Sequence, residues 1–271
     1  MHIAGNNFGS IAIALSVVLA FPITAFAQES ADELAKKLSN PVAALISVPL
    51  QFNGDFNYGT EDGTRVNLTI QPVIPSSISE NWNVITRVIV PITSQNDIAG
   101  KSGHQFGLGD ITPSFFFSPK APTAGGLVWG VGPAFLLPTA TDDLLGTGKY
   151  GMGPTAVVLK QTTGGWTYGA LVNQIWSVGG QSGRADVSSM FLQPFLAKSL
   201  GKGRTLSFNF ESTYDWETEK WGVPFNASYS KVMKWGDQLV SLSGGARVWV
   251  ETPGKGPDWG VRFVLTLLYP K

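Results

Sequence analysis

The feature that most constrains the fold of this chain is a repeated alternation of apolar and polar side chains. Alternation of this kind gives a strand one apolar face and one polar face. The stretches where it is clearest are 50–58, 65–71, 205–215 and 221–231. They predict strands that separate two different environments along most of their length.

Twelve segments of the chain can be interpreted as strands of this type. Most are long enough for the roughly 9–11 residues that a tilted strand needs to cross a bilayer, whereas strands of soluble proteins are usually about 5–6 residues long. The pattern predicts an all-β fold, a transmembrane antiparallel up-and-down β-barrel of about 12 strands over residues 45–271, preceded by a short helix. The expected strands are 45–58, 64–74, 82–93, 106–118, 127–138, 152–161, 166–177, 188–199, 205–215, 221–232, 238–250 and 259–269.

The connections between these segments alternate in length. Four long ones, at 94–105, 139–151, 178–187 and 251–258, all fall on the odd-numbered side, whereas 162–165 and similar even-numbered connections are short. Barrels of the outer membrane have long outer loops and short periplasmic turns. Tryptophans near the expected strand ends predict aromatic girdles at both membrane interfaces. The girdle candidates are Trp82, Trp166, Trp176, Trp216, Trp221, Trp249 and Trp259.

Prolines inside or near the expected strands conflict with a simple closed barrel. Such a barrel has no edge strand, where a proline could sit without the loss of a hydrogen bond between strands. Bulges or shifted strand boundaries account for only some of them. The prolines concerned are Pro72, Pro91, Pro113, Pro133, Pro154, Pro194 and Pro224.

The N-terminus has the pattern of a secretory leader. Residues 1–27 contain no Lys, Arg, Asp or Glu, and their apolar run ends in the small-x-small sequence Ala25-Phe26-Ala27. We expect a signal peptide over 1–27, although its first residues lack the usual basic charge and a membrane anchor is the alternative. In the following segment, 28–44, Ser30 and Glu33 fit a capping box and predict a helix over 31–39. That helix is expected either to plug the barrel or to lie in the periplasm.

Composition excludes several classes of protein. Lys plus Arg and Asp plus Glu number 19 each, so the chain lacks the excess of basic residues that is expected of a nucleic-acid-binding protein. The chain has no cysteine, which rules out disulfides and thiol chemistry. His104 is the only histidine after the leader and is expected in a loop, so no catalytic residue, no metal site and no cofactor is predicted. Asp142 and Asp143 are interpreted as a charged turn.

Ionisable residues on the polar faces of the strands form the candidate site. By alternation they point inward, where they either line a water-filled path or pair with one another. Four acids against four arginines predict a neutral, partly cross-linked interior with a constriction. The lumen-lining candidates are Asp55, Arg65, Arg87, Asp110, Glu211, Asp215, Arg247 and Arg262.

Several stretches resemble a bacterial outer-membrane barrel family that is named for the phenol meta-cleavage pathway and whose members are sometimes mislabelled neuromedin U. The resemblance covers essentially all of the chain after the leader, and it implies an outer-membrane barrel with a transport role and no defined substrate. The C-terminal Tyr269-Pro270-Lys271 departs from the terminal Phe common in such barrels. The stretches that carry the resemblance are Leu34–Ala43, Ile46–Gln51, Gly107–Asp110, Phe116–Lys120, Leu136–Asp143 and Glu211–Trp216.

The sequence therefore predicts an outer-membrane barrel that acts as a narrow channel or transporter for small, apolar or aromatic solutes. Its expected partners are outer-membrane lipid, lipopolysaccharide, the barrel-assembly machinery and a small-molecule solute of unknown identity. Two alternatives remain at this point. One is a closed structural or surface barrel whose outer loops carry the function, and the other is a soluble periplasmic β-barrel binding protein.

Overall fold

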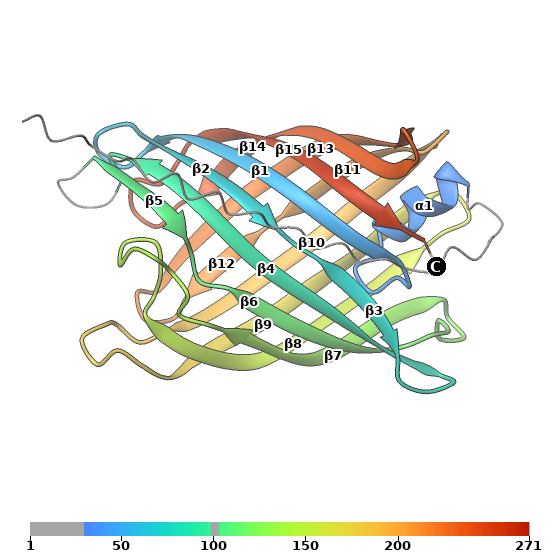
Figure 1. Cartoon of the computed structure of the whole chain (residues 1–271), viewed down its shortest axis with the longest axis horizontal. Helices are drawn as coiled ribbons and strands as arrows, with labels where there is room; N and C mark the ends of the chain where they lie inside the picture. Colours follow the sequence, from blue (N-terminus) through green and yellow to red (C-terminus); the bar gives the residue numbers. More distant parts are fainter. Residues whose placement is uncertain (1–29, 99–102, 271) are drawn as a thin grey trace, which may run out of the picture.

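A computed structural model describes residues 30–98 and 103–270, so the predicted signal peptide lies outside the described residues. Within these residues, one helix is followed by strand segments up to Tyr269 (Figure 1). These elements are α1 (Ala31–Leu38), β1 (Ile46–Tyr58), β2 (Gly63–Ile70), β3 (Val73–Ser77), β4 (Trp82–Asn96), β5 (His104–Leu108), β6 (Thr112–Pro119), β7 (Leu127–Leu136), β8 (Lys149–Gln161), β9 (Trp166–Gly180), β10 (Ser188–Gly201), β11 (Arg204–Phe210), β12 (Ser212–Asp215), β13 (Lys220–Trp235), β14 (Gln238–Glu251) and β15 (Trp259–Tyr269).

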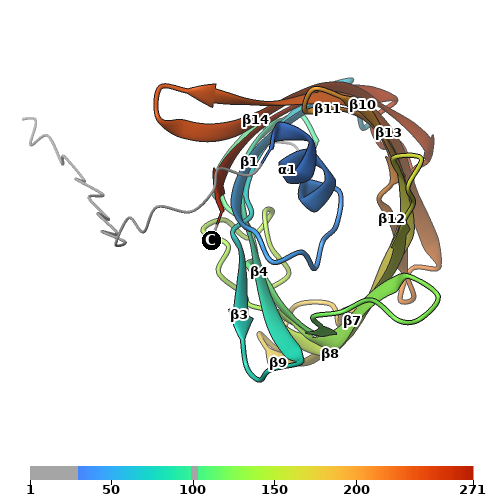
Figure 2. The same ribbon diagram turned by 90° about the vertical axis from the view of Figure 1, so that its right-hand side faces the viewer.

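The segments form one antiparallel barrel in chain order. Three successive pairs, β2 with β3, β5 with β6 and β11 with β12, are halves of a single interrupted strand, so the barrel has 12 strands. The first and last strands close it, with Ile46 opposite Tyr269 and Phe56 opposite Trp259. Figure 2 shows the closed ring end-on. The predicted fold class and the number of strands are confirmed.

The two ends of the barrel differ in their connections. At the end that holds α1, hereafter the helix end, strands are joined by tight turns such as 162–165 and 236–237. At the other end, hereafter the loop end, the longest connection is 137–148. The helix-end connection 120–126 is one exception, because it is as long as the loop-end connections 181–187 and 252–258. The loop-end connections 59–62 and 216–219 are others, because they are as short as 162–165.

The 137–148 loop is held in place by polar side chains from neighbouring elements. The Asp110 carboxylate accepts hydrogen bonds from the backbone N–H groups of Ala140 and Thr147, at 3.2 and 2.6 Å. The Arg184 guanidinium donates to the carbonyls of Asp143, Gly146 and Thr147. The loop therefore has a defined conformation over this end of the barrel.

Beside that loop, an ion pair joins β8 to the 181–187 connection. Lys149 Nζ lies 3.0 Å from Asp186 Oδ1, and Ser177 Oγ also donates to this carboxylate. The hydrogen bond and charge of Lys149 lower the pKa of Asp186. Because Asp186 is exposed, this pair orients the connection more than it stabilises the fold.

The three strand interruptions each face a proline on the neighbouring strand. The carbonyls of Pro49, Pro91 and Pro224 accept from the N–H groups of residues 71, 109 and 211, which lie in the three gaps. In an antiparallel ladder, paired residues exchange two hydrogen bonds, and proline supplies no N–H for the second. The strand opposite therefore loses its regular pairing at that point. Two of the conflicting prolines, Pro91 and Pro224, are thereby explained, and Pro72 lies in a gap itself.

Helix α1 lies inside the helix end of the barrel rather than beside it (Figure 2). Its capping box is present, with Ser30 Oγ accepting from the Glu33 N–H and the Glu33 carboxylate accepting from the Ser30 N–H. The side chain of Leu34 is fully buried. It packs with Val232 of β13, Leu268 of β15 and Leu45, which directly precedes β1. Asp32 Oδ1 also accepts from the N–H of Gly203, in the turn between β10 and β11.

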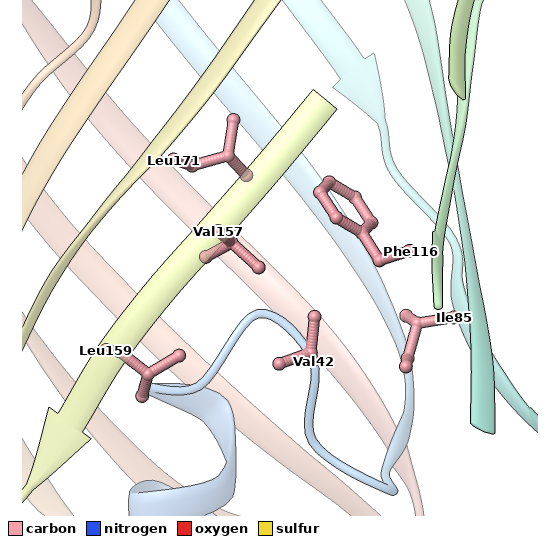
Figure 3. Packing of buried hydrophobic residues seen from close by; sticks show 6 residues of the cluster. All are labelled: Val42, Ile85, Phe116, Val157, Leu159 and Leu171. Atoms are coloured by element: carbon pink, nitrogen blue, oxygen red, sulfur yellow. The ribbon is translucent and has the colours of Figure 1, made fainter. Parts of the chain in front are cut away.

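The chain after α1 runs deeper into the barrel and meets an apolar wall. Figure 3 shows Val42 facing a cluster of side chains from four strands. The cluster consists of Val42, Ile85, Phe116, Val157, Leu159 and Leu171, all of them buried. Strict alternation assigns polar side chains to the interior, so this apolar patch on β4, β6, β8 and β9 departs from the simple pattern.

The outer face of the barrel is apolar. Phe52 and Phe263 pair across the β1–β15 seam, and both are exposed, as is Leu242 on β14. Exposed apolar surface of this extent is typical of a protein that is embedded in lipid or bound to a partner. In the part of the chain that the structure describes, no helix is long and apolar enough to span a membrane.

We predict that Leu34→Ala loosens the docking of α1. The substitution empties a fully buried site, and such changes cost about 2–5 kcal/mol. Trypsin can cut after Lys36 and Lys37 only when this helix is released, so cleavage there is expected to become at least tenfold faster. The readout is limited proteolysis of the refolded protein. Leu34→Met, which keeps the volume, is the control and should remain near the wild-type rate; equal rates for all three proteins would contradict the docking.

Candidate functional site in the barrel lumen

Four charged side chains meet inside the barrel, and we call Asp55, Glu211, Arg247 and Arg262 the ionic network. Arg262 on β15 donates Nη1 to Glu211 Oε1 at 2.8 Å and Nη2 to Glu211 Oε2 at 2.7 Å. This two-point pairing is the strongest form of an Arg–carboxylate contact. Arg247 on β14 lies 3.2 Å from Asp55 Oδ1 and 3.9 Å from Glu211 Oε2. The network thus joins β1, β14, β15 and the gap between β11 and β12.

Two glycines lie opposite residues of the ionic network. Gly260 lies opposite both Asp55 and Arg247, and a Cβ there would be 2.6 Å from Asp55 Oδ1. Gly245 on β14 lies opposite Arg262, and a Cβ there would clash with Ala227 and Ser228 of β13. Asn53 completes the arrangement, because its Oδ1 accepts from Arg262 Nε at 2.7 Å. The missing side chain at Gly260 allows Asp55 and Arg247 to pair across the intervening strand β15.

The other two arginines of the lumen have neutral partners. Arg65 donates Nε and Nη2 to Gln95 Oε1, at 3.1 and 2.8 Å, and its guanidinium lies 4.7 Å from the centre of the Tyr58 ring. Gln95 in turn donates to Gln105 at 2.9 Å. Arg87 donates Nη2 to Gln71 Oε1 at 3.0 Å. Both guanidinium groups are therefore hydrogen-bonded to neutral side-chain amides.

The remaining two candidates, Asp110 and Asp215, serve loops instead. Asp110 fixes the 137–148 loop as described above, and Asp215 accepts from the N–H groups of Glu217 and Thr218 in the β12–β13 turn. Among the described residues, no hydrogen bond or ion pair joins either of them to the other six. Two carboxylates and four arginines of the candidate set thus contact one another or neutral amides, whereas Asp110 and Asp215 bond to loop backbone, and Asp215 also lines a second cavity.

Most of the tryptophan candidates are exposed or half-buried near strand ends. The Lys198 ammonium lies 4.8 Å from the centre of the Trp166 ring, and the Trp259 ring contacts that of Phe56 in a tilted arrangement, with centroids 4.7 Å apart. Trp249 differs from them. It is half-buried, the Arg247 guanidinium lies 5.5 Å from its ring centre, and its indole N–H has no partner among the described residues. The exposed tryptophans are Trp82, Trp166, Trp176, Trp216 and Trp259, while Trp221 is partly covered by Tyr214.

Uncharged polar residues were missed by the search for ionisable groups. Asn53, Gln71, Gln95 and Gln105 take part in the lumen contacts as directly as the charged residues do. The sequence contained a signal for Asn53 and Gln71, because Asn53 shares the strand face of Asp55, and Gln71 continues the face of Arg65. Counting amides along the same alternation would have found them.

A cavity of about 340 Å³ lies between α1 and the barrel wall. Serine hydroxyls from β11, β13 and β14 line one side of it. Leu171 and Phe195 line another side, together with Val73. Arg87 and Gln71 also reach its surface. The lumen therefore has a polar side and an apolar side, and a charged group is available between them.

His104 lies at the start of β5 rather than in the expected loop. Its Nε2 is 3.3 Å from Ser94 Oγ on β4. A Ser–His pair becomes a nucleophile when a third group orients the imidazole. No such hydrogen bond to the ring is present in the described ranges. Those ranges also contain no group of three or more acidic or histidine side chains placed to hold a metal ion.

Comparison with known proteins shows the fold of the chain. No family model matches it, and no curated protein matches it. Its structure is similar to the crystal structure of the COG4313 outer membrane channel from Pseudomonas putida F1, with a TM-score of 0.63 and 13% identity, covering 83% of this chain and 96% of that one. The chain thus has the fold of an outer-membrane barrel. The phenol meta-cleavage name receives no support from this similarity.

Weaker structural similarities also involve outer-membrane barrels. Outer membrane phospholipase A from Escherichia coli has a TM-score of 0.47 and 13% identity, covering 89% of this chain and 98% of that one. The β-domain of the Bordetella autotransporter BrkA has a TM-score of 0.44 and 8% identity, covering 83% of this chain and 100% of that one.

We predict that Glu211→Gln weakens the barrel and makes its lumen more selective for anions. The change leaves Arg262 without its two-point partner, and breaking a buried pair in this way costs about 3–5 kcal/mol. Unfolding of the refolded barrel in urea is expected to shift to lower concentration. The positive excess in the lumen also increases, so the reversal potential under a KCl gradient should move toward that of chloride.

The matched control is Glu217→Gln, which removes one negative charge from an exposed turn. It should change neither the urea midpoint nor the reversal potential measurably. A Glu211→Gln protein that behaves like this control in both measurements would contradict the assigned role of the ionic network.

Proposed function

We propose that the protein is a narrow channel or transporter of the outer membrane for small solutes with an apolar part. The observation that carries this proposal is the two-sided lumen, in which the apolar cluster around Phe116 faces the inside of a barrel that also has a charged, hydroxyl-rich side. A purely structural barrel needs only a filled interior. A cavity with polar and apolar sides is suited to a small amphipathic molecule.

The N-terminal segment 30–45 supports a restricted rather than an open pore. Its helix lies within the helix end of the barrel, and Val42 reaches the apolar cluster. Its attachments include the hydrogen bond from Gly203 to Asp32 and one from Gln161 Nε2 to the Lys36 carbonyl, at 2.9 Å. We infer that this segment acts as a plug, which must shift when a solute passes.

The apolar outer face supports the further proposal that lipid and lipopolysaccharide surround the barrel in the bacterial outer membrane. Insertion there would involve the barrel-assembly machinery, and export would use the predicted leader at 1–27. The helix end would then face the periplasm, because outer-membrane barrels carry their longer loops outside. We propose no enzymatic activity, since the Ser94–His104 pair lacks an orienting group in the described residues.

We predict that deleting residues 31–43 raises single-channel conductance several-fold. The deletion removes α1 and Val42 but leaves β1 intact. The measurement is current through the refolded protein in a planar bilayer, with insertion checked by heat-modifiable gel mobility. Leu34→Asp, which places an unpaired carboxylate in a fully buried site, should release the plug and give a similar increase.

Leu34→Met serves as the control and should conduct like the wild type. Unchanged conductance in both the deletion and Leu34→Asp would remove the plug from the proposal. Inserted barrels that stay silent in every variant would favour the alternative, a closed structural barrel with its function in the outer loops. Recovery of the protein only in the soluble periplasm would favour a soluble binding protein.

A further inference from the structure

Arg87 lines the cavity without an ion-pair partner among the described residues, although its charge interacts at longer range with that of Glu211. Its single hydrogen bond among the described residues goes from Nη2 to the Gln71 amide oxygen. No carboxylate of the described chain forms an ion pair with it, whereas Arg262 pairs with Glu211, and Arg247 pairs with Asp55 and Glu211. A guanidinium carries five N–H donors in a planar fork, so most of the donors of Arg87 remain available to a ligand.

The surroundings of Arg87 combine this charge with an apolar surface. Val73 is paired with Arg87 across β3 and β4, and Leu171 and Phe195 line the same cavity. All three belong to the apolar cluster or pack against it. On the opposite side, hydroxyls of Ser228 and Ser241 offer further hydrogen bonds. The cavity volume of about 340 Å³ lies within the range typical of small-molecule sites, about 300–1,000 Å³.

We propose that this cavity binds a small carboxylic acid with an apolar or aromatic body. The carboxylate would take the free donors of Arg87, and the body would lie against Leu171 and Phe195. A guanidinium pairs with a carboxylate at two points, which selects this anion over a neutral analogue of similar shape. The inference rests on the proposed function, because it names the class of solute that would pause between the plug and the ionic network.

The test compares benzoate with benzamide, its neutral counterpart, on the refolded full-length barrel by titration calorimetry. The wild type is expected to bind benzoate at least tenfold more tightly than benzamide, and Arg87→Gln should abolish this preference. Phe195→Ala should weaken benzoate binding several-fold while leaving the preference for the anion. The result that overturns the site is a wild-type protein that does not distinguish the two compounds.

Arg65→Gln is the matched control, because it removes one lumen arginine that does not line the cavity. It should retain benzoate binding within about twofold, given that ionic interactions weaken with distance in a solvated lumen. An equal loss in both arginine variants would mean that the overall field of the lumen attracts the anion, and it would overturn the site. If Arg87→Gln does not fold, Arg87→Lys tests the two-point pairing of the guanidinium. This variant should keep the charge but lose most of the preference for benzoate over benzamide.

The inference and the proposed function can fail separately. Conductance of the same preparations in a planar bilayer reports the channel, and calorimetry reports the site. Discrete current steps without benzoate binding would leave the channel in place and remove the site. Benzoate binding by a barrel that never conducts would support the site and point to a binding protein instead.

Discussion

Closure of a 12-stranded barrel imposes the constraint on which the other features depend. In hydrocarbon every backbone N–H and C=O must be paired within the protein, and only a closed ladder does this for strands. The β1–β15 seam supplies that closure. A ring of this size encloses more space than side chains of the usual kind fill, unlike a barrel of about eight strands. The interior is accordingly occupied by the N-terminal segment, the ionic network and the apolar cluster.

Sequence patterning predicted the barrel well but only half of its lumen. The clearest alternation occurs in β1, β2, β11 and β13, whose inward residues are polar or charged. On the opposite side, stretches such as 115–117 and 156–159 are apolar at consecutive positions, because those strands face lipid on one side and the apolar cluster on the other. Runs of this kind have no period of two. Their loss of alternation was itself the signal of an apolar inner wall.

The sequence predicted the residue types of the candidate site but not which of these residues pair with one another. Parity along a strand tells on which face a residue lies, but it does not tell whether the ladder is interrupted. Asp110 lies in a gap opposite Pro91, and Asp215 ends a short segment beside a turn, so both bond to loop backbone. These interruptions depend on which residue of the neighbouring strand each proline faces. That register follows from the assembled sheet and not from any local pattern.

The pairing of Asp55 and Glu211 with arginines has a consequence for any solute of the proposed channel. Glu211 and Asp55 are already paired with other arginines, so among the described residues no carboxylate in direct contact with Arg87 has to be displaced by an incoming anion. An incoming cation, by contrast, would have to break one of these pairs and leave a guanidinium without its partner, which is costly in a confined space. In the proposed channel, the ionic network would therefore limit cations by occupying the carboxylates. The apolar wall beside Arg87 would then favour, among anions, those that carry an apolar part.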